Sequence, residues 1–413
     1  STYCCTPSMR NNYSPSMIRR YLQYLQQSLR DWNEIFLSEL RTIFSDAGVL
    51  IFFILVPLGY PLLYTFIYNK ETIREVPVAV VDNSRTKISR EYLRHLDATA
   101  DVQIVSHCAD MAEARDLVRE REAYGVVEIP ADFSKALNRG KQTSVSIFVD
   151  MSGLLYYKAI LTSNTNVSLS MNADIKAQRA GATTAQQEAV SVQPIAYEEV
   201  SLFNPTNGFA SFLIPAVLIL LIQQTLILGV GMAAGTAREA GRLGRLLPAM
   251  ERRGGLMRII LGKGAAYLLV YLPISVYVLG IVPHLFRLNQ LSNPWTLPLF
   301  VVPYLMACIS FSLALSAILK HRETVILLVV FTSVPLLFIS GISWPGSSIP
   351  DFWKYVSYIF PSTFGINGFI KANNMGAPLA YLRTECTMLW LQAFLYFFVA
   401  VAMYRRNLMR IKD

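Results

Sequence analysis

The stretch TAREAGRLGRLLPAMERRGGLMRIILGK, residues 236–263, separates two apolar runs, residues 208–234 and 264–282, which are each long enough to cross a bilayer. The stretch is too short to form a domain of its own. By the positive-inside rule, a short loop that is rich in basic residues stays in the cytoplasm. The arginines responsible are Arg238, Arg242, Arg245, Arg252, Arg253 and Arg258. Residues 235–263 are therefore predicted to form a cytoplasmic loop between two membrane spans.

Arginines and leucines recur in this loop at helical spacing, which predicts a short amphipathic helix parallel to the membrane, from Arg238 to Met250. An ordinary topogenic loop explains the positive charge but not the apolar face. A docking element for a cytoplasmic partner explains both. In this hypothesis the leucines fill a groove of the partner, and the charged residues form ion pairs at its rim. The predicted docking residues are Arg238, Glu239, Arg242, Leu243, Leu246 and Leu247.

The composition of the chain is that of a membrane protein. Of its 413 residues, 53% are hydrophobic and only 16% are charged, and the mean hydropathy is +0.37. The formal net charge of +9 is concentrated beside the apolar runs, where membrane topology explains it before a nucleic-acid partner does. We therefore expect a lipid bilayer, and no nucleic acid, around this chain.

Six apolar runs predict an α-helical polytopic membrane protein with six transmembrane helices. The runs are residues 48–68, 208–234, 264–282, 297–319, 324–342 and 384–404. Basic residues cluster in residues 1–47, in the opening loop, in the turn 320–322 and in the tail 405–413, so both termini are expected in the cytoplasm. Residues 343–380 are too apolar for a solvated loop and predict short re-entrant helices in the outer leaflet.

Ahead of the first span, Met17 to Asp46 has the pattern of an amphipathic helix. Apolar residues such as Trp32 and Ile35 are predicted on one side, and Asp31 with other charged residues on the opposite side. A membrane span follows at once, which favours an interfacial elbow helix over a helix packed on a soluble core.

Between the first two spans, residues 69–207 form an insert in which strand-like and helix-like segments alternate, which predicts a small extracytoplasmic α/β domain. Its expected strands are residues 76–82, 102–107, 123–130 and 144–150. A long polar helix from residue 154 to about 188 then returns the chain to the membrane. The insert contains neither glycine-rich phosphate-binding fingerprint, so a nucleotide-binding domain is not expected there.

No pattern of catalytic or metal-ligating residues stands out in the sequence. Gly262-Lys263 resembles the end of a Walker A motif, but Met257 replaces its first glycine. The four histidines are scattered, unlike the ligand clusters of zinc sites. Asp82, at a strand end, is interpreted as the start of an Asx turn rather than as a cation ligand. We therefore expect no enzyme activity, cofactor or metal on this chain.

Polar residues inside the spans are costly in lipid, so they are expected to face protein or a cavity. The candidates for a substrate pathway are Gln223, Gln224, Thr225, Thr332 and Ser333. Hydrogen bonding between helices explains the first three equally well. The spans are expected to lack Asp, Glu, Lys and Arg, which disfavours an ion-coupled carrier because coupling carboxylates lie inside spans.

From about Leu29 onward the chain resembles the membrane (permease) subunit of type-2 ABC exporters, in the branch with a large external domain between the first two spans. The resemblance is carried by LSELRTIFSD (37–46), PVAVVDNS (77–84), YGVVEIPADFSKAL (124–137), AREAGRLGRLLPA (237–249) and SGISWPGSSIPDFWKYVSYIFPSTFGINGF (340–369). Arg238, Glu239 and Gly241 fit the opening of the family's coupling loop, whereas Arg242 stands where threonine is common.

The resemblance implies a dimer of such subunits in a bacterial inner (plasma) membrane, formed with a second copy or a homologue. Two ABC ATPase subunits, which bind ATP and Mg, are expected beneath it and dock on the 236–258 loop. The implied function is export of an amphipathic or lipid-like substrate or drug, and the participation of a periplasmic adaptor and an outer-membrane channel stays open. The alternative is a non-transporting sensor or tether that signals through the external domain. Co-purification of an ATPase would separate the two.

Overall fold

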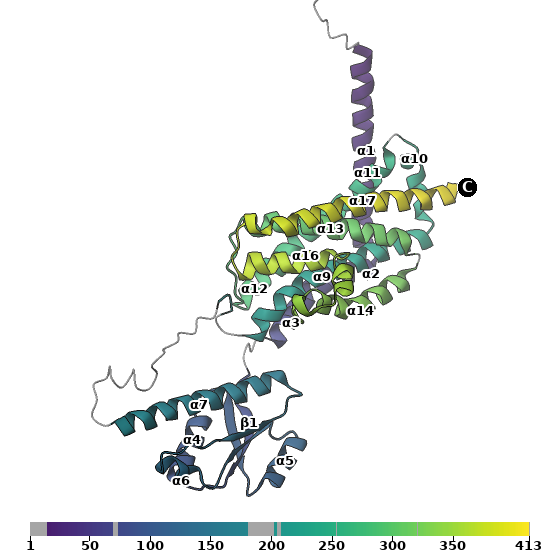
Figure 1. Ribbon diagram of the computed structural model, residues 1–413. Helices are drawn as coiled ribbons and strands as arrows, with labels where there is room; N and C mark the ends of the chain where they lie inside the picture. The colour runs from purple at the N-terminus through teal and green to yellow at the C-terminus, as the bar shows by residue number, and fades with distance from the viewer. Residues whose placement is uncertain are drawn as a thin grey trace, which may run out of the picture. The chain divides into compact units, whose positions relative to one another are not determined.

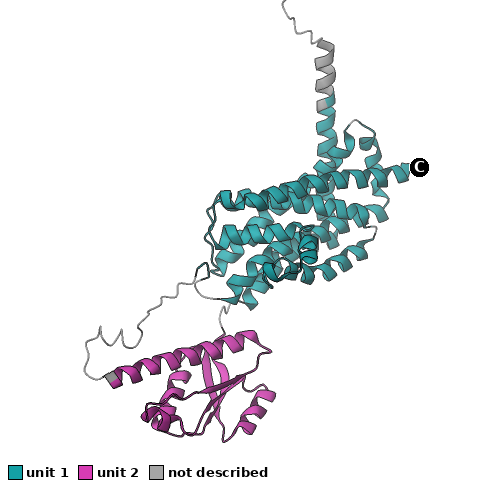
Figure 2. Cartoon of the chain, viewed as in Figure 1, with its two compact units in different colours: residues 1–69, 202–413 teal, residues 70–201 magenta. Residues whose placement is uncertain are grey.

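The computed structural model describes residues 15–68, 73–180, 202–204, 208–252, 254–319 and 321–412. The chain divides into two units (Figure 2). Residues 1–69 and 202–413 form a helical unit, and residues 70–201 form an inserted unit built on a β-sheet. This division follows the contrast between the apolar runs and the alternating pattern of the insert, and it confirms the predicted fold class.

The helical unit begins with α1 (Pro15–Ser45) and contains, within the described residues, six helical segments long and apolar enough to cross a membrane (Figure 1). The segments are Ala47–Ile67, Phe209–Glu239, Gly255–Leu285, Thr296–Ile318, Arg322–Ile339 and Leu379–Lys412. The first consists of α2 (Ala47–Leu50), the π-helical turn η1 (Ile51–Leu55) and α3 (Val56–Ile67). The third consists of α11 (Gly255–Val276), the π-helical turn η3 (Tyr277–Ile281) and α12 (Val282–Leu285).

The second span, α9 (Phe209–Glu239), is the central helix of this unit. In the most apolar 18-residue stretch of α9, 83% of the residues are buried, whereas the corresponding figure for α14 (Arg322–Ile339) is 17%. Close packing depends on glycine, because a Cβ on Gly229 would lie 1.7 Å from the ring of Phe53 on η1. Such a small residue lets two helices approach each other closely inside a membrane.

Two further spans, α13 (Thr296–Ile318) and α17 (Arg383–Lys412), run side by side along most of their length (Figure 1). Residues 343–380, expected as re-entrant helices, hold a series of short helices. They are η4 (Gly346–Ser348), α15 (Asp351–Ser357), α16 (Pro361–Phe369), η5 (Ile370–Asn374) and, at its end, η6 (Leu379–Leu382). Of these, α16 packs closely against α13, since a Cβ on Gly365 would lie 2.4 Å from the ring of Tyr304.

The inserted unit has a four-stranded sheet in the order β2-β1-β3-β4. Its strands are β1 (Val76–Asp82), β2 (Val102–His107), β3 (Gly125–Ile129) and β4 (Ser146–Val149). Strand β1 is parallel to β2 and β3, and β4 is antiparallel to β3. The parallel connections run through α4 (Lys87–Asp97) and α5 (Met111–Arg119), and α6 (Phe133–Asn138) joins β3 to β4.

Both faces of the central strand β1 are covered, which is why its residues form a continuous apolar run. One face packs against α4 and against α7 (Leu154–Ala180), with Tyr92 and Ile160 in this core. The other face packs against α5, with Cys108 and Ala114 in a smaller core. The long polar helix expected to end near residue 188 is α7, and residues 181–188 lie outside the described residues.

Candidate functional site

The loop between α9 and α11 begins at a glycine that ends the helix before it. Gly241 has φ +64°, a left-handed conformation that favours glycine. After it come the 3-10 helix η2 (Arg242–Leu246) and one turn of α-helix, α10 (Leu247–Met250). Arg238 and Glu239 belong to the last turn of α9. The single helix predicted from Arg238 to Met250 is therefore wrong, because Gly241 divides it.

The leucines of the loop pack against the chain's own helices. Leu246 and Leu247 are half-buried and contact a cluster formed by Ile35 of α1, Ile259 of α11 and Leu408 of α17. The exposed residues between Gly241 and Pro248 are Arg242 and Arg245. The face of the loop that a partner can reach is therefore mainly basic, and the leucines hold the loop against the helical unit.

A row of carboxylates on and beside α1 provides further support for the loop. Asp31 accepts hydrogen bonds from Arg252 and, at 3.1 Å, from Arg258. The hydrogen bond and the charge of Asp31 raise the pKa of the Arg252 guanidinium. Glu39 accepts from Lys263 at 2.5 Å and from the hydroxyl of Tyr267. Both carboxylates are buried. The prediction that Asp31 lies on the side of the helix opposite Ile35 was therefore wrong, since both residues are buried.

Asp46, which follows α1, holds three helix ends together. It caps α2 by accepting from the amides of Gly48 and Val49, at 2.9 and 3.3 Å. It also accepts from Thr236 near the end of α9, at 2.7 Å, and from Arg322 at the start of α14, at 3.3 Å. Burial works against ionisation of Asp46, but these hydrogen bonds and the charge of Arg322 outweigh it and lower the pKa of the carboxyl.

Arg238 caps the carboxyl end of α13 rather than reaching outward. Its guanidinium donates to the carbonyls of Leu319 and Ser316, at 2.7 Å for the latter. Asn407 of α17 donates to the carbonyl of Ala317, at 2.7 Å. The last carbonyls of a helix have no partner within the helix, so these two side chains tie α9 and α17 to the end of α13.

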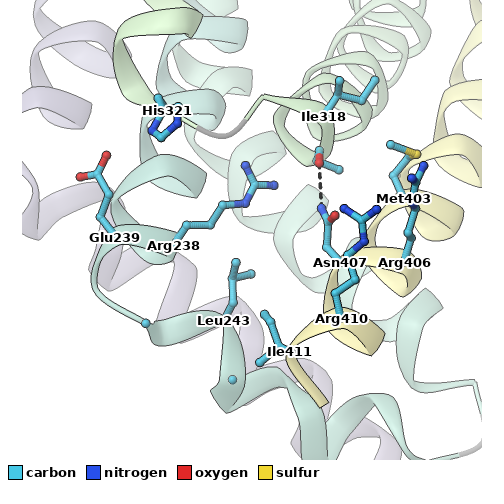
Figure 3. Close-up of a pocket in the computed structure, with 13 residues that line it drawn as sticks. Arg238, Glu239, Leu243, Ile318, His321, Met403, Arg406, Asn407, Arg410 and Ile411 are labelled. Carbon is cyan, nitrogen blue, oxygen red and sulfur yellow. Dashed lines mark hydrogen bonds between the residues drawn. The ribbon is translucent and has the colours of Figure 1, made fainter. Parts of the chain in front are cut away.

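Around this helix end lies a cavity of about 740 Å³ (Figure 3). Its basic side chains are Arg238 from α9, His321 beside α14, and Arg406 and Arg410 from α17, and Glu239 is the acidic residue in its lining. Its apolar lining includes Leu243, Ile318, Met403 and Ile411. The cavity thus combines a basic and an apolar wall, and it could not be predicted from the sequence because its residues come from three stretches that lie far apart in the chain.

The proposed substrate-pathway residues lie in two environments. Gln223, Gln224 and Thr225 are buried in the middle of α9. The side-chain oxygen of Gln223 accepts from the amide of Ser362 at 2.6 Å, so it holds the first turn of α16 in place. Both polar atoms of the Gln224 side chain are buried without a hydrogen-bond partner.

The two remaining candidates, Thr332 and Ser333, are half-buried on α14 and donate to carbonyls of their own helix. Their hydroxyl groups are thus satisfied within α14. These hydrogen bonds point to no second element.

The expectation that the spans lack Asp, Glu, Lys and Arg was wrong. Glu385 lies in the first turn of α17, is buried, and forms an ion pair of 2.5 Å with Lys371 of η5. Lys263 is likewise buried inside α11 against Glu39. A pair of opposite charges can be buried where a single charge cannot, because each partner offsets the desolvation of the other.

The inserted unit offers no metal site within the described residues, where no group of three His, Cys, Asp or Glu could hold an ion. Asp82 forms an Asx turn, as expected. Its carboxylate accepts from the amides of Ser84 and Arg85, each at 3.0 Å, and from the hydroxyl of Ser89 at 2.7 Å.

Comparison with known proteins places this arrangement among transporters. Residues 47–402 match the family described as ABC-2 family transporter protein. The chain is 22% identical over 368 residues to the linearmycin resistance permease protein LnrN of Bacillus subtilis (strain 168), covering 81% of this chain and 90% of that protein. It is 22% identical over 406 residues to ABC transporter G family member 20 of Dictyostelium discoideum, covering 96% of this chain and 53% of that protein. It is also 27% identical over 119 residues to nodulation protein J of Rhizobium meliloti (strain 1021), covering 28% of this chain and 45% of that protein.

Proposed function

The chain belongs to the ABC-2 family of transporter membrane proteins, and we propose that it is the permease of an exporter whose ATPase subunits dock on the loop between α9 and α11. Permeases of this family are multi-pass membrane proteins without catalytic activity of their own, and they pair with ABC ATPase subunits. ATP and Mg would then bind on the partner. This accounts for a chain with six candidate spans and no nucleotide-binding fingerprint in its sequence.

The docking proposal rests on one observation: a short, exposed basic loop is held in place by packing and ion pairs with the rest of the helical unit. The exposed Arg242 and Arg245 lie on a segment fixed by the half-buried Leu246 and Leu247 and by the ion pairs of Asp31. A rigid element loses little conformational freedom on binding. In this proposal Glu239 and Leu243 complete the docking surface beside the cavity, and Arg238 holds this part of the loop in place through its hydrogen bonds to the end of α13.

The experiment compares Arg242→Ala, Leu246→Asp and Arg287→Ala in membranes that contain both subunits. The control is Arg287, an exposed arginine just beyond α12. It lies at the end of the third span that is opposite to the loop. Burial of a leucine side chain contributes about 1.5–3 kcal/mol and an exposed ion pair about 0–1 kcal/mol. Leu246→Asp should therefore abolish ATPase co-purification and transport, Arg242→Ala should weaken both mildly, and Arg287→Ala should change neither. An intact complex in the Leu246→Asp protein would disprove docking at this loop.

For the substrate, we propose an amphipathic or lipid-like compound or drug that leaves the cytoplasm or the inner membrane of a bacterium, with both termini of the chain cytoplasmic. A relative named for resistance to linearmycin supports this class. The buried Gln224, with two unpaired polar atoms in the central helix, is the first residue to test for contact with it. A periplasmic adaptor and an outer-membrane channel remain optional partners in this proposal.

We further propose that two copies, or this chain and a homologue, assemble through α14. This helix is the least buried of the six spans, and its exposed residues include Leu327, Phe331 and Phe338. A two-fold axis beside α14 would place position 331 of one copy near that of the other. Cysteine at Phe331 should then cross-link between copies, whereas cysteine at Phe394 of α17, which is also exposed, should not. Cross-linking at neither position would favour a different interface.

The alternative function, a non-transporting sensor or tether, places the activity in the inserted unit. It predicts that deletion of residues 73–180 abolishes signalling while no ATPase co-purifies with the full chain. Stoichiometric co-purification of an ATPase would exclude it.

A further inference from the structure

The cavity around the end of α13 has an excess of positive charge that the chain itself leaves available. Arg406 and Arg410 are exposed, and neither forms an ion pair within the described part of the chain. Arg238 contributes a third charge, although its donors cap α13. The acidic residue of the lining, Glu239, is exposed and balances one of the three. An anion in this cavity would meet two free guanidinium groups, the side chains best suited to phosphate.

The length of α17 indicates how deep in the bilayer these arginines lie. Its 30 residues span about 45 Å at 1.5 Å per residue. A bilayer is about 40–45 Å thick with its headgroups, of which the hydrocarbon core is about 30 Å. Arg406 and Arg410 lie in the last two turns of α17, beyond the reach of the core. The end of α13 and the start of α14 lie at the same cavity, so it opens at the level of lipid headgroups.

Apart from His321 and Asn407, the remaining lining of the cavity consists of apolar residues and glycines, and its apolar part continues along the span. Ile318 is 52% exposed and Ile411 47%, although both line the cavity. On α17 the exposed apolar residues Leu391, Leu395 and Val399 recur every fourth position and lead toward Met403 at the cavity wall. Residues four apart share one face of a helix. This face would accept an acyl chain directly above the two arginines, a feature that a soluble anion does not need.

We propose that this cavity binds the phosphate of an anionic membrane phospholipid, with Arg406 and Arg410 as its ligands and the apolar face of α17 along one acyl chain. Arg238 adds charge and holds the cavity wall in place. Figure 3 shows Arg238 on α9 and the two other arginines on α17, on different walls of the same space. The proposal requires only that the chain spans a bilayer, so it does not depend on ATPase docking at the loop.

The consequence for transport follows from the shared residues. Gly241, Leu243 and Gly244 of the loop form part of the cavity wall. A bound lipid would contact the same segment that is proposed to receive the ATPase. Anionic lipid should therefore raise the rate of ATP hydrolysis by the assembled transporter, because it stabilises the loop.

The test measures lipid bound to the full-length permease after delipidation in a neutral detergent, by native mass spectrometry. Phosphatidylglycerol and phosphatidylcholine are titrated separately against the natural protein, an Arg406→Gln/Arg410→Gln variant and an Arg405→Gln/Arg41→Gln control. The control removes the same charge from exposed positions outside the cavity. Each lost charge-assisted hydrogen bond should weaken phosphatidylglycerol binding roughly tenfold. The control should bind it as the natural protein does, and phosphatidylcholine should bind all three equally weakly.

Further results distinguish a phospholipid in the cavity from a soluble anion or an acidic residue of the partner. Arg406→Lys/Arg410→Lys should recover much of the binding, because it restores the charge, and an unchanged apparent Tm should show that the glutamine variant is folded. Displacement of the lipid by millimolar inorganic phosphate would overturn the proposal in favour of a soluble anion. Loss of ATPase co-purification in the glutamine variant with undiminished lipid binding would overturn it in favour of an acidic residue of the partner. Equal binding of phosphatidylglycerol to the variant and the control would also overturn it.

Discussion

Glu39 of α1 and Lys263 of α11 form an ion pair of 2.5 Å in which both side chains are about nine-tenths buried. The second carboxylate oxygen of Glu39 accepts a hydrogen bond from Tyr267. The elbow helix is thus attached to the third span by a buried charge pair. Such a pair is sensitive to the loss of one member, because the other is then left as an uncompensated buried charge.

Lys263→Met should lower the stability of the helical unit by about 3–5 kcal/mol, since it leaves the buried Glu39 without its counter-charge. The double variant Glu39→Leu/Lys263→Met should recover most of this loss, because apolar residues then replace both charges. Chemical or thermal unfolding in detergent measures the effect, and Glu34→Gln, at an exposed site of the same helix, serves as the control. A double variant less stable than the Lys263→Met protein would contradict this account.

Gly229→Ala should destabilise the protein by about 1–3 kcal/mol or more, the usual cost of overpacking. The new methyl group would lie 1.7 Å from the ring of Phe53, which is itself fully buried. Gly59→Ala, on the exposed side of α3 where a Cβ meets nothing within 4 Å, should leave stability unchanged or improve it. Apparent Tm values of the two variants, measured side by side, test this. Equal Tm values would mean that Phe53 moves aside.

The six spans and the alternating pattern of the insert were predictable because burial dictates them locally. An apolar run of about 20 residues can satisfy its backbone only as a helix, and the alternation of strands with helices indicates a sheet covered on both faces. Individual helix ends were less predictable. Instead of one helix from Arg238 to Met250, α9 ends at Glu239, since Gly241 with its positive φ interrupts a pattern that spacing alone would continue.

The carboxylates of α1 show why the site was harder to predict. Asp31 and Glu39 lie on α1 and Asp46 directly follows it, at eight- and seven-residue intervals, whereas charged neighbours such as Glu34 and Arg41 are exposed. Intervals of seven and eight residues are typical of one face of a helix. Only the partners Arg252, Lys263 and Arg322 show that this face is buried, and they lie more than 200 residues away in the sequence. A pattern of amphipathicity cannot distinguish a solvated charge from a paired one.

Asp46→Asn should remove a pH-dependent part of the stability. The folded-state pKa of Asp46 lies below its ordinary value of 3.8, so its contribution is fully present above about pH 4 and is lost as the pH falls through the folded pKa. Unfolding midpoints from pH 3 to pH 7 should therefore fall less steeply toward acid in the Asp46→Asn protein than in the natural one. Parallel curves would show that Asp46 does not link stability to pH.

Gln223→Leu and Gln224→Leu should have different effects although the residues are neighbours. Gln223 holds the amide of Ser362, so its loss should cost about 1–3 kcal/mol of stability by leaving that amide unpaired. Gln224 has no such bond to lose, so its replacement should preserve stability and instead change export of the substrate. Transport assays together with Tm measurements distinguish the two. Full transport by the Gln224→Leu protein would remove this residue from the proposed pathway.

The topology of the inserted unit is best tested at Ala98 rather than at Cys108. Cys108 is buried, and this burial raises the pKa of its thiol. A labelling reagent therefore reaches this side chain poorly, and little of the reactive thiolate is present. Ala98 is exposed just after α4. In a background without other cysteines, Ala98→Cys should react with an impermeant maleimide once the outer membrane alone is permeabilised. Labelling that requires rupture of the inner membrane would place this unit on the opposite side.

The central helix α9 is one continuous α-helix of 31 residues, and at 1.5 Å per residue it is about 46 Å long. Its first residue, Phe209, comes a few residues after the inserted unit, and its last, Glu239, stands at the basic loop. An α-helix resists compression, so a displacement applied at Glu239 reaches Phe209 nearly undiminished unless the helix bends. Its interior proline, Pro215, lies close to the Phe209 end. The helix therefore links the basic loop mechanically to the residues that follow the insert, and Pro215, which removes one backbone hydrogen bond, is the position where it would bend most easily.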